Sequence, residues 1–564
     1  MKVSSEIKTV NGKPRLFISG KEQSGLAYIT YLNERSCYDD FSDAGYTLYS
    51  VSLFFGTNHL NEKSGQIVFS KGIFDGDIPD FDEFDKNIDK LLLACPRAMI
   101  IPRVNVSPSR EWELSYPDEL CDTGLDRDPD CHRLCFASDV WAKEAKRQLS
   151  LFVAHINDSP YAEHIVGYQI ACGNTEEWLP FDMKGSLGLR SREKYEAYLK
   201  ENNILDSDGE IYKFLSNVNA KRVVELAEYV KHITENRLIV GAFYGYTFET
   251  YWRESAHHAL NVLLRSDSID FICSPVSYCA YSGGRVLGVD HAYMLPLASL
   301  IHHGKLYFSE NDTRTHNSTP PNDLPHYQSP VWFGPDKSTS LEILKMHYAR
   351  SLINGHALWW FDMWGGWYKD CDYMSFMKNA LEISEKNKKL GHEKCTEIAV
   401  FIDEEACSFA ENKESAKKIC HYVRKELGHI GAPYDAYLAS DFEAVSDNYK
   451  AFILLSPAAT ELGKKMTEIA SAHALPLFIV DDATRDVSAS ELREFCRGAN
   501  VHLYCDDNAV IYANKNYLFV HTASAGECRL NIKDGKRLFE VLEKKYYEST
   551  FNSDFGKSYL FEYK

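Results

Sequence analysis

The chain has 564 residues, too many for one hydrophobic core, so its length predicts about two to four domains. A net charge of −19 at pH 7 argues against nucleic acid or an anionic membrane surface as a partner. No apolar run approaches the roughly 18 residues of a membrane-spanning helix, and the N-terminus lacks the apolar core of a signal peptide. The 15 cysteines are scattered and odd in number. We therefore expect a cytoplasmic protein with reduced thiols.

Short apolar runs alternate with amphipathic stretches through the first two thirds of the chain. Eight runs have the length and composition of strands: Gly25–Thr30, Tyr46–Phe55, Ala98–Val106, His164–Gly173, Leu238–Tyr246, Ile269–Tyr278, Lys305–Glu310 and His356–Trp364. The stretches between them predict helices at Phe81–Leu93, Ser138–Ile156, Asn219–Asn236, Thr250–Arg265, His291–His303 and Ser340–Asn354. Eight strand–helix repeats with nearly continuous apolar strands predict a parallel (β/α)₈ TIM barrel. The preceding Asn11–Gly20 segment predicts a hairpin that plugs the N-terminal mouth of the barrel.

A second pattern begins after residue 392. Buried-strand runs at Glu397–Asp403, Ala451–Ser456 and Pro476–Asp481, separated by helical segments, predict a smaller doubly wound α/β domain. The tail contains the runs Ala509–Ala513 and Tyr517–Thr522, which predict a small antiparallel β domain. The predicted domains are therefore residues 1–392, 393–505 and 506–564.

Two acidic positions follow strands of the predicted barrel. Glu310 ends the seventh strand, and the pair Glu176 and Glu177 follows the fourth. Active sites of such barrels lie at the C-terminal ends of the strands. Retaining glycosidases need two carboxyl groups about 5–5.5 Å apart, one as nucleophile and one as acid. A lone glutamate would more simply cap a helix, but the combination predicts a retaining glycosidase. Since neighbours in an extended chain point to opposite sides, we expect only one of the pair, Glu177 beside Trp178, to face the barrel axis.

Further residues at the predicted strand ends are candidates for binding the sugar: Arg103, Asn105, Asn174, Tyr278, Arg314, His316, Trp360 and Trp364. A cation or phenol beside the nucleophile lowers its pKa, whereas a drier setting raises that of the acid. We expect Tyr278 to hydrogen-bond Glu310. Trp360 is the best candidate for the floor under the sugar, within a run of four tryptophans. Each of these side chains has an alternative role as a structural ion pair or a packed ring.

Metal and cofactor signals are weak. Cys121, Cys131, His132 and Cys135 offer zinc ligands, but their spacing matches no standard ligand set. No phosphate-binding glycine loop or HExxH motif is present in the sequence. We predict no cofactor and no metal.

Several motifs resemble those of clan A glycoside hydrolases: Ile101-Pro-Arg-Val, Trp112 with Tyr116-Pro-Asp-Glu, Gly167-Tyr-Gln-Ile, Glu177-Trp178 and Glu310-Asn-Asp-Thr-Arg-Thr-His. The order of barrel, amidotransferase-like α/β domain and small β domain is similar to that of the family 42 β-galactosidases. This resemblance implies Glu177 as acid/base, Glu310 as nucleophile and a middle domain that mediates trimerisation. Clan members carry Asn directly before the acid/base; here Glu176 occupies that position and Asn174 lies two residues earlier. Both glutamates therefore remain candidates.

The sequence favours a retaining exo-β-glycosidase, most similar to a β-galactosidase, that acts on oligosaccharides or glycosides as a homo-oligomer. A β-mannosidase or another clan A β-glycosidase is the alternative enzyme. A carbohydrate-binding pseudoenzyme is the alternative from another class. An amidotransferase would need a nucleophilic cysteine at a sharp strand–helix turn, and Cys407 does not follow its strand in that way.

Overall fold

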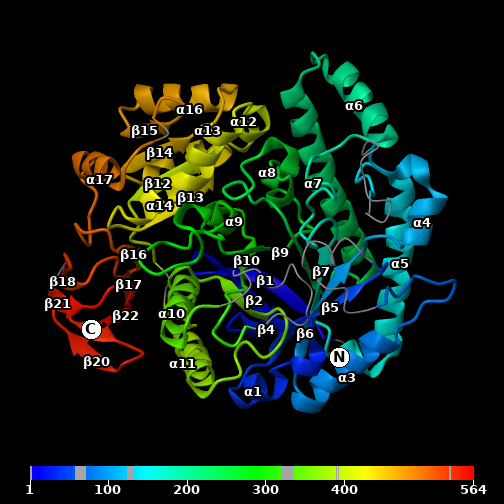
Figure 1. The fold of residues 1–564 in the computed structure, drawn as a ribbon, viewed down its shortest axis with the longest axis horizontal. Helices are drawn as coiled ribbons and strands as arrows, with labels where there is room; N and C mark the ends of the chain where they lie inside the picture. The colour runs from blue at the N-terminus through cyan, green and yellow to red at the C-terminus, as the bar shows by residue number, and fades with distance from the viewer. Residues whose placement is uncertain are drawn as a thin grey trace.

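The computed structural model describes residues 3–57, 71–122, 133–318, 334–388, 390, 393–484, 486–532 and 535–564. Within them a closed parallel barrel has the strand order β10-β11-β4-β5-β6-β7-β8-β9 (Figure 1). Its strands are β4 (Leu26–Thr30), β5 (Leu48–Phe54), β6 (Met99–Asn105), β7 (Gly167–Ala171), β8 (Ile239–Phe243), β9 (Phe271–Pro275), β10 (Leu306–Asn311) and β11 (Ala357–Asp362). All eight predicted strands are confirmed.

The barrel is closed at its N-terminal end by a hairpin of β1 (Ser5–Val10) and β2 (Lys13–Ile18). Asn11 and Gly12 both have positive φ, 51° and 75°, as a two-residue hairpin turn requires. The Ser5 amide donates to the Arg237 carbonyl over 2.9 Å, just before β8. Leu16 and Ile18 of β2 pack into the same core cluster as the inward-facing barrel side chains. The predicted plug is confirmed.

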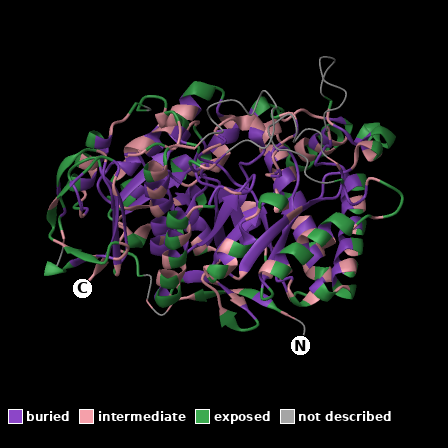
Figure 2. Cartoon of the chain, turned by 60° about the horizontal axis from the view of Figure 1, so that its bottom comes forward, coloured by how far each residue is buried: buried purple, intermediate pink, exposed green. Residues whose placement is uncertain are grey.

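Helices surround the barrel and bury its outer face (Figures 1 and 2). The longer ones are α3 (Asp82–Ala94), α5 (Asp139–Asp158), α6 (Leu189–Asn202), α7 (Asp208–Ile233), α10 (Lys337–Asn354) and α11 (Cys371–Asn387). Shorter helices include α1 (Tyr38–Asp43), α4 (Arg110–Ser115), α8 (Leu260–Leu264) and α9 (Leu297–His302). Ser138 caps α5, because its hydroxyl accepts the Trp141 amide hydrogen over 2.9 Å.

Three predicted helices are wrong in extent. Helix α7 begins at Asp208, well before the predicted start at Asn219. The stretch 250–265 contains only the turn η4 (Arg253–Ser255) and α8, with Ala256 in a left-handed conformation between them. Buried His258 hydrogen-bonds the Thr250 carbonyl over 2.8 Å and so holds a loop there instead of a helix. In the stretch 291–303 the helix begins only after Pro296, since the residues before it run as buried extended chain.

The remaining chain forms separate sheets. A four-stranded parallel sheet has the order β13-β12-β14-β15, with β12 (Ile398–Ile402), β13 (Tyr434–Leu438), β14 (Ala451–Leu455) and β15 (Leu477–Val480). The principal helices beside it are α12 (Glu404–Phe409), α14 (Val423–Gly428), α16 (Glu461–Ala472) and α17 (Ala489–Gly498). A five-stranded antiparallel sheet follows, with β16 (Val510–Ala513), β17 (Tyr517–His521), β22 (Ser558–Tyr563), β19 (Leu538–Glu540) and β20 (Lys545–Tyr547). The predicted fold class, a TIM barrel followed by an α/β domain and a β domain, is confirmed. Among the described helices, none is both long and apolar enough to cross a membrane.

Candidate active site

Glu310 lies near the C-terminal end of β10 and is only 5% exposed. Its carboxylate forms an ion pair with Arg103, which comes from β6 and is 1% exposed. Arg103 is held in turn by Gln169 on β7, whose Oε1 accepts from Nε over 3.1 Å. The guanidinium also lies over the rings of Phe243 and Phe361, at 4.7 and 5.2 Å. The candidate nucleophile is therefore paired with a fully enclosed, fixed cation.

Glu177 follows β7 in a tight turn of unusual backbone conformation. Gly173, Thr175, Glu176 and Trp178 all have positive φ, at 81°, 57°, 67° and 60°. Three non-glycine residues in this region within four positions mark a strained segment, a feature that clusters at functional sites. Glu177 itself is partly exposed, and its Oε1 accepts a hydrogen bond from the Tyr246 hydroxyl over 2.9 Å. Its other oxygen accepts from the Thr175 hydroxyl.

Glu176 also reaches the end of the barrel. It is 0% exposed, and its Oε2 accepts from the hydroxyl of Tyr31, which follows β4. The same Tyr31 oxygen accepts from Arg103 over 3.4 Å. The expectation that only one of the two neighbouring glutamates faces the barrel is therefore wrong. It assumed an extended chain, whereas the left-handed turn directs both side chains toward the same end.

Burial gives Glu177 and Glu310 higher pKa values than those of solvent-exposed glutamates. Burial raises the pKa of Glu177 to about 8, and the nearby Glu310 carboxylate adds to this shift. Burial also raises the pKa of Glu310 to about 7, against the opposing charge of Arg103. The expected low pKa of the nucleophile is thus not found, because desolvation outweighs the ion pair. Burial raises the pKa of Glu310 less than that of Glu177, because the charge of Arg103 opposes the effect at Glu310.

The other polar residues predicted to bind the sugar make different contacts, and not all of them face Glu310 and Glu177. Asn105 ends β6, and the nearness of its side-chain amide opposes the rise that burial causes in the pKa of Glu176. Asn174 lies in the turn, and its buried Oδ1 has no hydrogen-bond partner among the described residues. Arg314 stands 6.0 Å from the Trp367 ring centroid. His316 is directed elsewhere, because its Nδ1 lies 2.6 Å from the Tyr373 hydroxyl on α11.

The predicted hydrogen bond from Tyr278 to Glu310 is absent from the described contacts. Tyr278 lies three residues beyond β9 and is 44% exposed, with its ring 4.8 Å from the guanidinium of Arg285. The phenol that contacts the candidate acid, Glu177, is instead that of Tyr246, beyond β8. The chain runs on past the ends of β8 and β9 in irregular loops, so strand-end position alone did not show which tyrosine turns inward.

The tryptophan run is buried. Trp360 is 0% exposed and faces away from the mouth, because its Nε1 donates to the Tyr46 hydroxyl over 3.0 Å in the core between barrel and helices. The interpretation of Trp360 as the sugar floor is therefore wrong, since alternate residues of β11 point outward. Trp364 and Trp367 pack edge to face in the barrel-interior cluster, with their ring centroids 5.6 Å apart. Trp364 stays a candidate for binding the sugar.

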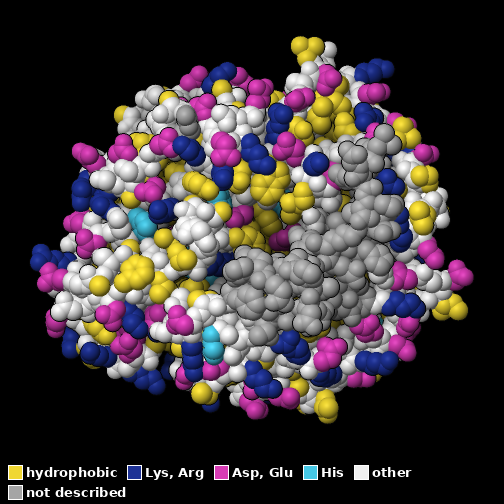
Figure 3. All heavy atoms as spheres, in the orientation of Figure 1, with side chains coloured by type: hydrophobic (Ala, Val, Ile, Leu, Met, Phe, Trp, Pro, Cys, Tyr) yellow, Lys and Arg dark blue, Asp and Glu magenta, His cyan; other side chains and the backbone are white. Residues whose placement is uncertain are grey.

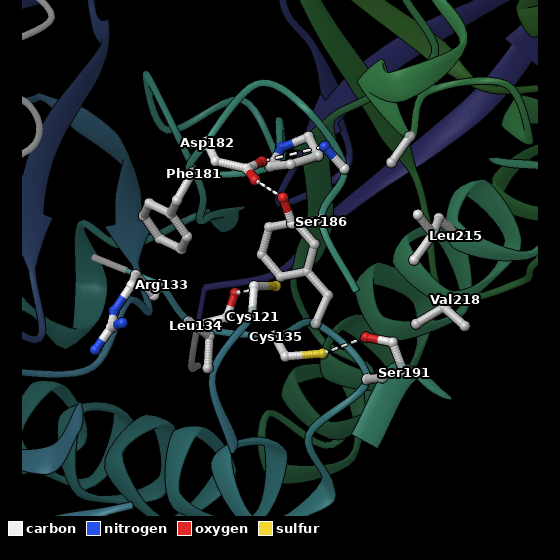
Figure 4. A pocket seen from close by; sticks show the side chains of 15 residues that line it. Cys121, Arg133, Leu134, Cys135, Phe181, Asp182, Ser186, Ser191, Leu215 and Val218 are labelled. Carbon is white, nitrogen blue, oxygen red and sulfur yellow. Dashed lines mark hydrogen bonds between the residues drawn. The ribbon is translucent and has the colours of Figure 1, made fainter. Parts of the chain in front are cut away.

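Two of the four possible zinc ligands, Cys131 and His132, lie outside the described residues. Cys121 and Cys135 line a small pocket beside the barrel with Phe181, Leu215 and Ser191 (Figure 4). Cys135 Sγ points at Ser191 Oγ over 2.8 Å. The described part of this segment shows a buried thiol, Cys135, beside the half-buried Cys121, and no complete ligand set.

Sequence reasoning missed several residues that complete the site. Tyr31 and Tyr246 hydrogen-bond Glu176 and Glu177, and Gln169 holds Arg103, as described above. Asp312 is 1% exposed and pairs with Arg285 over 2.6 Å on the β10 side of the mouth. Asp312 and Tyr246 were recognisable only as polar residues near strand ends, a signal that many loop residues share.

In the view of Figure 3, the face of the molecule is hollowed near its centre, with hydrophobic side chains around acidic ones at the bottom. The arrangement brings together two carboxyl groups with raised pKa values, one of them paired with a cation, in a shielded setting. These are the parts that glycoside cleavage with retention requires.

No family model matches the sequence, and no curated protein matches it. Solved structures do match over nearly the whole chain. The β-galactosidase of the psychrophilic Marinomonas ef1 superposes with a TM-score of 0.61 at 11% identity, covering 95% of this chain and 99% of that one. The β-galactosidase of Bacillus circulans sp. alkalophilus superposes with a TM-score of 0.58 at 11% identity, covering 96% of this chain and 99% of that one. A GH42 exo-carrageenase from Bacteroides ovatus superposes with a TM-score of 0.59 at 12% identity, covering 100% of this chain and 86% of that one.

The chain has the fold of the family 42 glycoside hydrolases. At these identities the likeness concerns the fold, and function must be argued from the site.

Proposed function

We propose that this protein is a retaining exo-β-glycosidase in which Glu310 is the nucleophile and Glu177 the acid/base. The observation that carries the proposal is the contrast between the two carboxyl groups. Glu310 is paired with the cation Arg103, whereas Glu177, among the described residues, accepts its side-chain hydrogen bonds from the neutral hydroxyl groups of Tyr246 and Thr175. An ion pair favours a carboxylate, and a neutral, partly buried setting favours a carboxylic acid.

The reaction follows from these protonation states. Glu310 attacks the anomeric carbon while the bond to the leaving oxygen breaks, and Glu177 gives its proton to that oxygen. The ionised Glu177 then takes a proton from water, whose oxygen attacks the anomeric carbon and releases Glu310. Glu177 suits this exchange better than Glu176 because it remains partly exposed, while Glu176 is fully enclosed.

Fold likeness makes a β-galactoside the first substrate to try, since several matched structures are β-galactosidases. A β-mannoside or another β-glycoside is the alternative within the same mechanism. The proposal includes a homo-oligomer, a trimer by family resemblance, and a cytoplasmic location consistent with the free cysteines among the described residues.

The test is hydrolysis of a panel of aryl β-glycosides by wild type, Glu310→Ala and Glu177→Ala. We expect one glycone to be cleaved with retention, observed by NMR of the first-formed sugar, and both variants to lose at least about 10³-fold in kcat/KM. Glu176→Gln is the control that tests whether the neighbouring Glu176, in place of Glu177, is the acid. A pseudoenzyme would bind the sugar without turnover and would show no rate for either variant to lose. Release of the inverted sugar would contradict the assignment of Glu310 as nucleophile.

A further inference from the structure

Two fully buried histidines form a hydrogen-bonded chain behind the strand that carries Glu310. His347 on α10 and His291, just before α9, are 2% and 0% exposed. His347 Nε2 lies 2.9 Å from His291 Nδ1, and His291 Nε2 lies 2.9 Å from the Val286 carbonyl oxygen. At the other end, His347 Nδ1 lies 2.8 Å from Asn311 Oδ1 and 3.1 Å from the Thr313 hydroxyl oxygen.

The chain has only one consistent set of protons when both rings are neutral. The Val286 carbonyl only accepts, so His291 carries its proton on Nε2 and accepts at Nδ1. His347 must then donate from Nε2 and accept at Nδ1. Thr313 donates its hydroxyl hydrogen there, and Asn311 must turn its NH₂ group toward the same nitrogen. That orientation also gives a partner to the Asn311 amide nitrogen, which as placed has none among the described residues. Burial lowers the pKa of both histidines, that of His291 to about 3, so neutral rings are expected.

Asn311 and Thr313 alternate with Glu310 and Asp312 along the chain. Successive side chains of a strand point to opposite faces. Glu310 and Asp312 therefore meet Arg103 and Arg285 on the mouth side, while Asn311 reaches outward to α10. One nitrogen of His347 thus contacts both Asn311, which directly follows Glu310, and Thr313, and these two residues bracket the mouth-facing Asp312.

The far end of the chain lies in residues 286–291, which meet both of the other domains. The Gly288 amide donates to His521 Nε2 on β17 over 2.8 Å, and its carbonyl lies 2.9 Å from His429 Nε2, just after α14. Asp290 accepts from the Tyr512 hydroxyl on β16. A methyl group on Gly288 would stand 2.7 Å from the Phe555 ring, so the two surfaces are in close contact. The small β domain therefore supports this segment directly.

We propose that His347 is a positioning residue for Glu310, and that residues 286–291 extend this support to the C-terminal β domain. The role rests on the proposed glycosidase function of Glu310. A nucleophile must be held within a fraction of an ångström of its attacking geometry. The histidine chain supplies this by pinning the end of β10 to α10 with directional hydrogen bonds, and it contacts no substrate.

The test compares His347→Leu with His347→Gln, whose amide can accept from Thr313 and donate to His291. His356→Leu is the matched control, because His356 is also buried but hydrogen-bonds Tyr293 at the opposite end of the barrel. We expect His347→Leu to lower kcat by about 10- to 100-fold with KM changed less than about threefold. His347→Gln should recover most of kcat, and His356→Leu should leave kcat of the folded enzyme unchanged.

Deuterium exchange of the peptide spanning residues 306–318 gives a readout that does not depend on turnover. It should become faster in His347→Leu and remain as in wild type in His347→Gln and His356→Leu. Unchanged exchange together with unchanged kcat would overturn the positioning role, as would equal losses in the leucine variants at 347 and 356. If the wild type cleaved no glycoside, the proposed function would fail, and the exchange experiment would still decide whether His347 holds the end of β10.

Discussion

Removing the hydroxyl of Tyr246 should shift the alkaline limb of the pH–rate profile and leave the acid limb in place. In the proposed mechanism, wild-type activity needs ionised Glu310 and protonated Glu177. The pKa values of about 7 and about 8 predict a narrow bell between these limbs. At pH 7.5, about 60% of the enzyme then holds the productive combination of charges.

The magnitude follows from one hydrogen bond. The Tyr246 hydroxyl donates to Glu177 Oε1 over 2.9 Å and stabilises its ionised form. A hydrogen bond to a charged group contributes about 1.5–3 kcal/mol, and about 1.4 kcal/mol corresponds to one pKa unit. A water molecule can replace part of the lost hydrogen bond, so Tyr246→Phe should raise the pKa of Glu177 by about one unit. Activity then persists to higher pH. Without this hydrogen bond the ionised form of Glu177 is less stable, so its pKa rises. Since the proposed first step needs protonated Glu177, the alkaline limb moves to higher pH.

The assay is kcat/KM for an unactivated phenyl glycoside between about pH 5 and 10, since a poor leaving group makes protonation limiting. Tyr244→Phe is the control: Tyr244 is equally buried, but its hydroxyl donates to the Ser216 and Ala256 carbonyls. A downward shift, or movement of the acid limb in place of the alkaline one, would refute the assignment of Glu177 as the acid.

Three further outcomes follow from the same contacts. Arg103→Met should cost about 3–5 kcal/mol of unfolding free energy, because it leaves a buried carboxylate unpaired, and should move the acid limb upward; calorimetry and the pH profile measure both. Glu177→Gln should melt higher than wild type by a margin that grows between about pH 5 and 9. The raised pKa of Glu177 contributes stability below its ordinary value of 4.5, and this is lost as pH rises through about 8, whereas glutamine does not titrate. Trp360→Phe should lower the melting temperature by a few degrees and leave KM within about twofold, and a large rise in KM would restore Trp360 as a sugar contact.

The sequence alone determined the framework of the protein. Apolar runs of strand length, separated by helical periodicity, recur eight times, and a parallel barrel is the closed arrangement that buries such strands on both faces. The same reasoning placed Glu310 and the pair Glu176 and Glu177 at one end of the barrel, because the C-terminal ends of parallel strands share an edge. Positions counted along a strand are local properties, and local sequence records them.

Only the tertiary structure decided what those side chains meet. The left-handed turn after β7 brings Glu176 to Tyr31 and Glu177 to Tyr246, although neither tyrosine stood out from many others in the sequence. Trp360 and Tyr278 failed as predicted contacts because the face of a strand residue and the path of a loop depend on packing against distant segments. The pKa values have the same origin: desolvation by the assembled barrel, rather than any neighbour in sequence, raises those of Glu177 and Glu310.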